Sequence, residues 1–112
     1  MIHAEENYAH KLRGAGERNA KAEEGVAATE ADVKMVIAQS KVTASMQGHK
    51  SNAAQENFAD QQVEVYEARL RVGVAKGELA SARTEVLACR MEFDQWRTKM
   101  ATLRKEQEIY RA

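Results

Sequence analysis

The sequence contains no proline, a single cysteine and only six aromatic residues among its 112. Without proline, no position forces a helix to break. Cys89 is the single cysteine, so an intrachain disulfide is excluded, which suits a reducing compartment. A compact globule of this length needs more large apolar side chains to fill its core. A helical bundle needs fewer, and it can bury surface against a partner chain.

Net charge and long apolar runs are also absent. Seventeen basic residues balance seventeen acidic ones, so bulk attraction to nucleic acid or to an anionic membrane is not indicated. No apolar stretch approaches the roughly 20 residues needed to span a bilayer. The first residues show no basic-then-apolar signal pattern. We therefore expect a soluble protein of the cytoplasm with no membrane partner.

The sequence is rich in residues that favour helices, with 20 alanines and many Glu, Lys, Arg and Gln residues. Gly48 predicts a helix stop. Ser51 or Asn52 predicts a new start, and Asn52 with Gln55 resembles a capping box. We expect one all-α domain over residues 1–112, with helix one at about 4–46, a turn at 47–51 and helix two at about 52–110. The two helices would form a long antiparallel hairpin, coiled-coil-like in its packing.

The start of helix one is the weakest part of this prediction. Gly14, Gly16 and Gly25 each cost about 1 kcal/mol relative to alanine in a helix. The apolar residues of helix one also drift around the helix instead of repeating at one position. Residues 1–20 are therefore expected to fray in isolation.

Helix two carries a heptad repeat. With Phe58 as position a, every a position up to Met100 is apolar, and most d positions are small, a pattern typical of a left-handed supercoil. We expect copies of the chain to meet on this seam, forming a dimeric or higher helical bundle. The expected seam residues are Phe58, Val65, Val72, Leu79, Val86, Phe93, Trp96, Met100 and Leu103.

Charged rows border the seam. The e row is basic and the g row is mostly acidic, so a parallel pair of chains would set Glu78 against Arg83, for example. An antiparallel pair would oppose arginine to arginine. The basic row has a second interpretation, because cations about 10.5 Å apart along a helix can contact DNA phosphates. Its residues are Arg69, Lys76, Arg83, Arg90, Arg97 and Arg104.

A second apolar stripe follows the opposite side of helix two, on positions b, c and f. A helix with two apolar faces must be covered on both. We expect one face to pack on helix one and the other on a second chain. Gly73 and Gly77 would let a neighbouring backbone approach closely. The stripe comprises Val63, Tyr66, Leu70, Gly73, Val74, Gly77, Ala80, Leu87 and Met91.

Nothing in the sequence predicts an active site. The three histidines are not spaced as metal ligands, and none is placed to activate Cys89 or a serine. Cys89 lies at a d position and is interpreted as a small core residue. Phe93, Trp96 and Met100 form an apolar patch that is either core or a docking site for a partner. We predict no enzyme activity, no catalytic residue, no metal, no cofactor and no small-molecule substrate.

The segment Glu92-Phe93-Asp94-Gln95-Trp96-Arg97-Thr98, with Ala101 and Arg104 after it, carries a family resemblance, and so does Gly48-His49-Lys50-Ser51 with Ala53-Ala54-Gln55-Glu56. These segments resemble small uncharacterised helical proteins of tailed bacteriophages, which end a long helix in Glu/Asp-x-Trp-Arg-Thr/Ser. The likeness covers about half of the chain. Such proteins are often encoded near replication and recombination genes, so the resemblance implies an accessory role in phage DNA metabolism within the bacterial host cytoplasm. It implies no catalytic residues.

Three functions follow as hypotheses. The first is a homo-oligomeric accessory or adaptor in DNA recombination or replication, with DNA or a phage recombination or single-strand-binding protein as a further partner. The second is a phage inhibitor of a host or defence enzyme. The third is a structural coiled-coil component.

Overall fold

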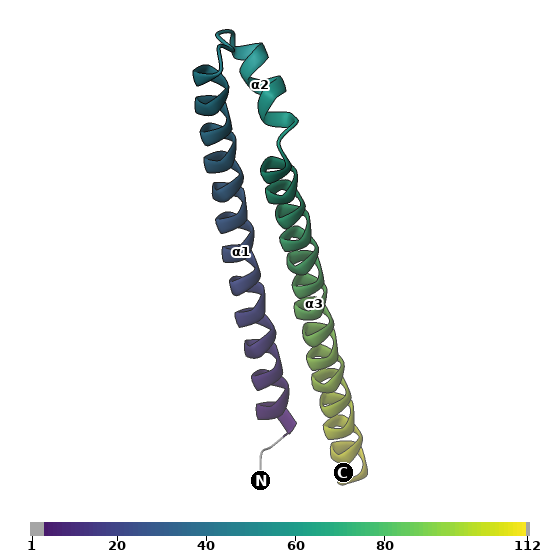
Figure 1. The fold of residues 1–112 in the computed structure, drawn as a ribbon. Coiled ribbons are helices and arrows are strands. Elements are labelled where there is room, and N and C mark those ends of the chain that lie inside the picture. Colours follow the sequence, from purple (N-terminus) through teal and green to yellow (C-terminus); the bar gives the residue numbers. More distant parts are fainter. Residues whose placement is uncertain (1–3, 112) are drawn as a thin grey trace. The chain divides into compact units, whose positions relative to one another are not determined.

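The computed structural model describes residues 4–111 and contains, within that range, three α-helices and no strand. They are α1 (Ala4–Met46), α2 (Asn52–Asp60) and α3 (Val63–Arg111). The predicted all-α class is confirmed, and the predicted bounds of helix one agree with those of α1. Figure 1 shows the order of the helices, with α2 between the two long ones.

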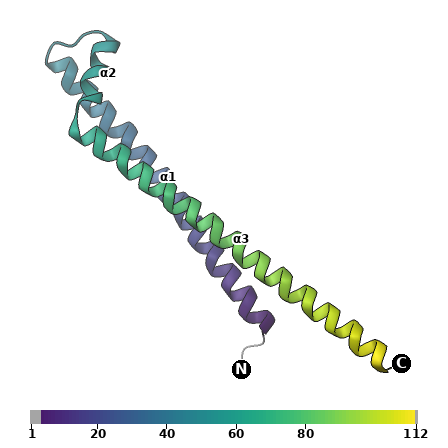
Figure 2. The same cartoon turned by 90° about the vertical axis from the view of Figure 1, so that its right-hand side faces the viewer.

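The chain divides into two compact units where we expected one domain. The turn unit comprises residues 21–80, and the terminal unit comprises residues 1–20 and 81–112. In a pair of long antiparallel helices, each segment contacts only the segment of the other helix directly beside it. Contacts between residues are therefore local along the helix pair. Within each unit, α1 and α3 run antiparallel and side by side (Figure 1; Figure 2).

The end of α1 confirms the predicted stop at Gly48. The backbone N–H of Gly48 donates to the carbonyl of Ser45 at 3.1 Å, and that of His49 donates to the carbonyl of Ala44 at 3.0 Å. This pair of bonds is a Schellman motif, which satisfies carbonyls that have no partner inside the helix. Gly48 has φ +97°, a conformation that glycine adopts without a Cβ penalty.

The start of α2 decides between the two candidate caps. The Ser51 hydroxyl accepts from the backbone N–H of Ala54 at 3.1 Å, so Ser51 is the N-cap. The capping box that we expected from Asn52 and Gln55 is therefore wrong. Gln55 instead donates from Nε2 to the carbonyl of His49 at 3.0 Å, which ties the helix to the turn before it.

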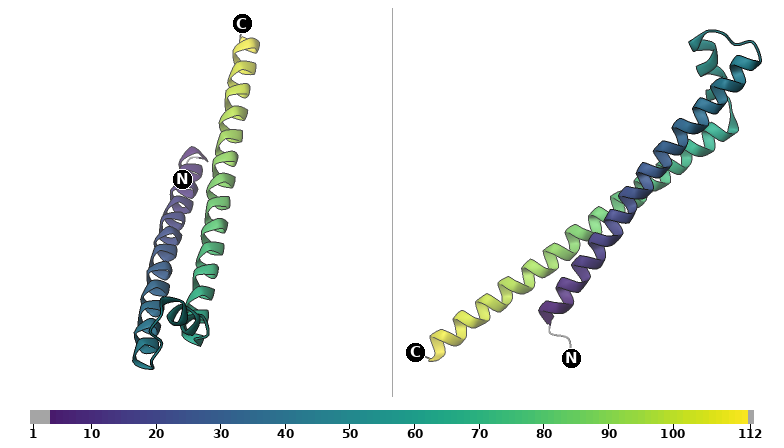
Figure 3. Two further views of the ribbon diagram at one scale, coloured as in Figure 1. Left: turned by 90° about the horizontal axis from the view of Figure 1, so that it is seen from above. Right: turned by 90° about the vertical axis from the view of Figure 1, so that its left-hand side faces the viewer.

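The expected continuous helix over 52–110 is also wrong, because it breaks at Gln61 and Gln62. Short-range bonds replace the helical ladder there: the N–H of Gln61 donates to Phe58, and that of Gln62 donates to Ala59. The Gln62 side chain also donates to the Phe58 carbonyl at 3.0 Å. The break lets α2 bury Ala59, which would otherwise lie on the solvent side of one continuous helix. Packing of α2 near the last turns of α1 therefore overrides local helix propensity (Figure 2; Figure 3).

The core of each unit is narrow and rich in alanine. In the turn unit, the most buried apolar residues are Ala44, Ala59, Val65, Ala68, Ala75 and Leu79. In the terminal unit they are Ala15, Ala82 and Phe93. Small side chains let two helices approach closely but bury little apolar area per residue.

Candidate functional site

The predicted oligomer seam of helix two faces the chain's own α1, which corrects our assignment of that seam to a second chain. Val65 and Ala68 are fully buried, and Leu79 and Phe93 are 9% and 8% exposed. Val72, Val86, Cys89, Trp96 and Met100 are half-buried. The heptad spacing identifies the covered face of α3 from Val65 to Met100, but spacing alone does not say which helix covers it.

Two expected seam residues lie elsewhere. Phe58 belongs to α2, where its ring centroid lies 5.4 Å from that of His49 in the turn. The helix break removes Phe58 from the register of α3. Leu103 is 41% exposed, in the last part of α3, where every described residue from 101 to 111 is exposed.

The face of α1 that meets this seam was missed in the sequence. From Tyr8 to Ser40 its inward residues recur at alternating intervals of four and three, which is a heptad pattern, and Ala44 follows after four more residues. Polar and small residues interrupt the apolar signal, and Asn19, Thr29 and Ser40 are all half-buried on this face. In the turn unit the face comprises Ala22, Val26, Thr29, Val33, Val36, Ser40 and Ala44, and in the terminal unit Tyr8, Leu12, Ala15 and Asn19.

Several charged residues on the borders of the seam form ion pairs within the chain. In the turn unit, Arg71 lies 3.1 Å from Asp32, and Lys76 lies 3.8 Å from Glu30. Arg69 lies 2.8 Å from Asp60, across the break between α2 and α3. All these side chains are about half exposed, so each pair contributes well under about 1 kcal/mol. The two pairs between α1 and α3 favour the antiparallel alignment of these helices in the turn unit.

The terminal unit has a comparable pair between Arg18 and Glu85. Arg18 donates from Nε to Glu85 Oε2 at 3.2 Å, and a second guanidinium nitrogen contacts the other carboxylate oxygen. The hydrogen bond to Glu85 raises the pKa of the Arg18 guanidinium above its ordinary value. Such two-point contact fixes orientation better than a single ion pair does.

An aromatic cluster joins α1 to α3 in the terminal unit. The ring of Tyr8 on α1 lies 6.0 Å from Phe93 and 5.6 Å from Trp96, centroid to centroid, and Phe93 lies 6.2 Å from Trp96. The Arg97 guanidinium lies 4.0 Å over the Phe93 ring. This patch is therefore core in the terminal unit, not a free docking site. It also explains why residues 4–20 are helical here, although they are expected to fray in isolation.

The basic row is not gathered into one site. Arg69 and Lys76 pair with carboxylates, and Arg97 lies on a ring. Arg83 and Arg90 border a shallow groove of about 280 Å³ in the terminal unit. Arg104 is exposed.

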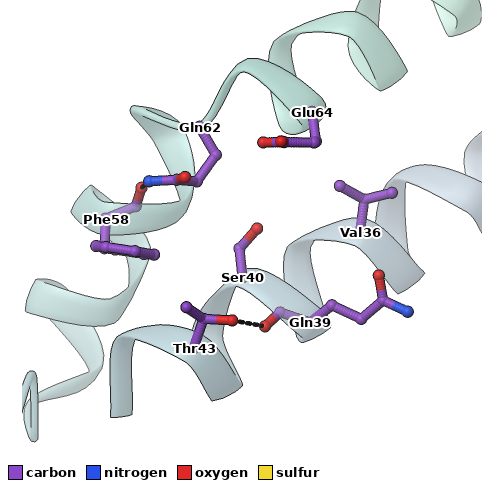
Figure 4. Close-up of a pocket in the computed structure, with 7 residues that line it drawn as sticks. All are labelled: Val36, Gln39, Ser40, Thr43, Phe58, Gln62 and Glu64. Atoms are coloured by element: carbon purple, nitrogen blue, oxygen red, sulfur yellow. Dashed lines mark hydrogen bonds between the residues drawn. The ribbon is translucent and has the colours of Figure 1, made fainter. Parts of the chain in front are cut away.

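A second groove, in the turn unit, lies beside the helix break (Figure 4). Its volume is about 270 Å³, and polar side chains dominate its walls. The Thr43 hydroxyl donates to the Gln39 carbonyl at 3.1 Å, so it serves the backbone of α1. In residues 4–111, no three His, Cys, Asp or Glu side chains gather as metal ligands. The groove is lined by Val36, Gln39, Ser40, Thr43, Phe58, Gln62 and Glu64.

The apolar face of α3 opposite its seam is left uncovered by the chain. In the turn unit, Val63, Tyr66, Leu70 and Val74 are 51–63% exposed. With Gly73, Gly77 and Ala80 they form what we call the outer stripe. The terminal unit, taken by itself, shows Leu87 and Met91 exposed at 57% and 61%. This stripe is the candidate interaction surface.

Comparison with family models, with curated proteins and with solved structures finds no match to this chain. Within residues 4–111, no helix combines the length and the apolar character that crossing a membrane requires.

Proposed function

We propose that this chain is a non-enzymatic helical hairpin that associates with a second copy of itself through the outer stripe. One observation carries the proposal: four large apolar side chains in the turn unit lie on the face of α3 that α1 does not cover. Contiguous exposed apolar side chains are typical of interaction sites. Single exposed apolar residues would need no such explanation.

The composition of the core supports the same proposal. Two helices packed through alanine bury little apolar surface, and most helical stability in proteins comes from packing of an apolar face. Covering the outer stripe adds a second packed face to α3. Oligomerisation is a common way for small chains to supplement a thin core.

Truncating Leu70 tests the proposed interface. The Leu70→Ala variant should dimerise about tenfold more weakly, because it removes apolar surface from the centre of the stripe while keeping a good helix former. The dissociation constant is measured by sedimentation equilibrium over a range of protein concentrations. Met35→Ala is the matched control, since Met35 is 60% exposed on α1 and outside the stripe. A wild-type protein that stays monomeric at all concentrations would overturn the proposal.

We further propose that the self-associated protein acts as an accessory or adaptor in phage DNA recombination or replication. The resemblance to tailed-phage proteins carries this part. Exposed arginines on α3 are compatible with phosphate contacts, and Arg83 and Arg90 border one groove.

DNA binding is expected to be weak and to fall steeply with salt. Fluorescence anisotropy with labelled single- and double-stranded oligonucleotides should show affinity that drops as NaCl rises from 50 to 200 mM, with a slope set by the few phosphates contacted. Arg83→Gln with Arg90→Gln should reduce that slope by about two. If the protein binds neither oligonucleotide at low salt, DNA is excluded as the partner. The adaptor would then act only by binding another protein. Stoichiometric co-purification with one host enzyme would favour an inhibitor, and assembly beyond a closed dimer would favour a structural component.

A further inference from the structure

The basic row of α3 differs between the two units. In the turn unit its cations are balanced inside the chain, since Arg69 lies 2.8 Å from Asp60 and Lys76 lies 3.8 Å from Glu30. In the terminal unit the row continues at every seventh residue as exposed arginine, and we call this part the arginine row. Within residues 4–111, no ion pair joins it to an aspartate or glutamate. It comprises Arg83, Arg90, Arg97, Arg104 and Arg111.

The edge of α1 beside the arginine row has no carboxylate that could neutralise it. Gly16 and Ala9 lie two and three heptads before Glu30, so they occupy the helical position from which Glu30 reaches Lys76. Both are small, and a Cβ added at Gly16 would meet no atom within 4 Å. A chain-like ligand can therefore lie against the arginines without displacing a long side chain of α1.

A groove marks this edge of the terminal unit. Its volume is about 280 Å³, and it is lined by Arg83 and Arg90 together with Asn19 of α1. Farther along the row, Arg97 lies over the Phe93 ring. Stacking uses the face of a guanidinium and leaves the N–H donors at its edge for a phosphate. The arginines thus form an extended strip and do not converge on a pocket.

Carboxylates near the arginine row reduce its charge without cancelling it. On α3, Asp94 and Glu108 each lie one turn from two of the arginines, and Lys105 adds a further cation. On α1, the charged residues bordering Ala9 and Gly16 are Glu6, Arg13 and Glu17. Seven cations therefore stand against four carboxylates. The strip is net positive over four heptads, roughly 42 Å at 1.5 Å per residue.

The surroundings of the arginine row favour a polyanion over a partner helix. A helix needs apolar contact beside the charges, because an exposed ion pair contributes well under about 1 kcal/mol. Beyond Met91, the positions bordering the row on its outer side carry no large apolar residue. They are Asp94, Thr98, Ala101, Lys105 and Glu108. A nucleic-acid backbone needs no such anchor, since each phosphate that an arginine neutralises releases counterions.

The spacing of the arginines separates a single strand from a duplex. Arginines seven residues apart are about 10.5 Å apart along α3, which equals about three nucleotides at 3.4 Å each. In a duplex of about 10.5 base pairs per turn, the third phosphate has turned by about 100° around the axis, away from a straight row. A single strand can present every third phosphate to the same side.

We propose that the arginine row binds the phosphate backbone of single-stranded DNA along the terminal unit. The inference rests on the DNA-binding part of the proposed function, and it names the site and the form of DNA. The row matches about 12 nucleotides of a stacked strand. Contacts to phosphates alone carry no sequence information, so binding is independent of sequence.

Anisotropy titrations of the full chain test the site. A labelled oligothymidylate of about 12 nucleotides should bind at least about tenfold more tightly than a duplex of the same length, at about 50 mM NaCl. Arg104→Gln with Arg111→Gln should lower the salt slope for the single strand by about two. Both arginines lie in the last turns of α3, where every described residue from 101 to 111 is exposed. Helicity by circular dichroism should therefore stay that of the wild type.

Two control variants accompany the arginine change. Lys21→Gln with Lys34→Gln removes the same charge from exposed positions of α1 in the turn unit, and it should leave the salt slope unchanged. Arg104→Lys with Arg111→Lys keeps both charges, and it should keep the wild-type slope because an ammonium group also neutralises a phosphate.

The possible results separate the inference from the proposal beneath it. If the duplex binds as tightly as the single strand, or if the arginine variant keeps the wild-type slope, the inference is wrong while DNA binding itself stands. If the lysine control lowers the slope as much as the arginine variant does, any cation of the chain suffices and the row is not the site. If the wild-type chain binds neither oligonucleotide, the DNA-binding part of the proposed function fails as well.

Discussion

Replacing Leu79 by aspartate is expected to unfold the hairpin, not merely to separate its copies. Leu79 is 9% exposed at the centre of the face that α3 turns to α1, between Ala75 and Ala82. The change removes a buried leucine, at about 2–5 kcal/mol, and introduces a carboxylate without a partner, which adds to that cost. Because a thin alanine-rich core buries little apolar surface, the free energy of unfolding of the hairpin is small. Helicity at 25 °C, measured by far-UV circular dichroism, should fall sharply.

Leu70→Asp is the matched control for this experiment. Leu70 lies on the same helix and in the same unit, but it is 51% exposed on the outer stripe. The same chemical change there should leave the helicity of the hairpin near that of the wild type and alter only its association. If Leu79→Asp keeps its helicity while Leu70→Asp loses it, the two faces of α3 have been assigned the wrong way round.

The double change Gly73→Ala with Gly77→Ala is expected to stabilise the single chain and to weaken the pair. In the helix, each alanine should raise the free energy of unfolding by up to about 1 kcal/mol, because the added methyl groups meet open space. At the proposed interface on the outer stripe, the same methyl groups crowd the partner helix, and overpacking costs about 1–3 kcal/mol at each site. The dissociation constant should therefore rise by at least about thirtyfold.

A destabilising mutation would lower both the stability of the chain and its association. The double variant should instead raise the free energy of unfolding while weakening association. The free energy of unfolding is measured by urea denaturation at a concentration where the protein is monomeric, and the dissociation constant by sedimentation equilibrium. Gly16→Ala is the control, since Gly16 also has no atom within 4 Å of an added Cβ but lies on α1. It should stabilise the chain and leave association unchanged. Wild-type or tighter association of the double variant would contradict packing of a second copy against this part of the outer stripe.

Much of α3 could be predicted from sequence because its pattern is strong. Val65, Val72, Leu79 and Val86 repeat every seven residues, and all lie on the covered face. The pattern does not specify which helix covers this face. A heptad seam looks the same whether a second chain or a returning helix fills it, and the inward face of α1 was obscured by Asn19 and Thr29.

The helix break could not be predicted, because no residue at Gln61 or Gln62 disfavours a helix strongly. Its cause is tertiary: Ala59 is buried and Phe58 contacts His49 only if α2 turns away from the line of α3. The aromatic cluster was half predicted. Phe93 and Trp96 were recognised as core candidates, but Tyr8 became their neighbour only through the fold.

An alanine-lined contact raises the question of what keeps one helix from sliding along the other. Ala68, Ala75 and Ala82 repeat every seven residues, so a shift by one heptad would again set methyl against methyl there at small cost. Such a slip is costly where the side chains differ from one repeat to the next. In the terminal unit, it would take Tyr8 away from Phe93 and Arg18 away from Glu85. These two contacts fix the alignment of α1 and α3 in the terminal unit, so a variant that lacks both should allow the two helices to change register there.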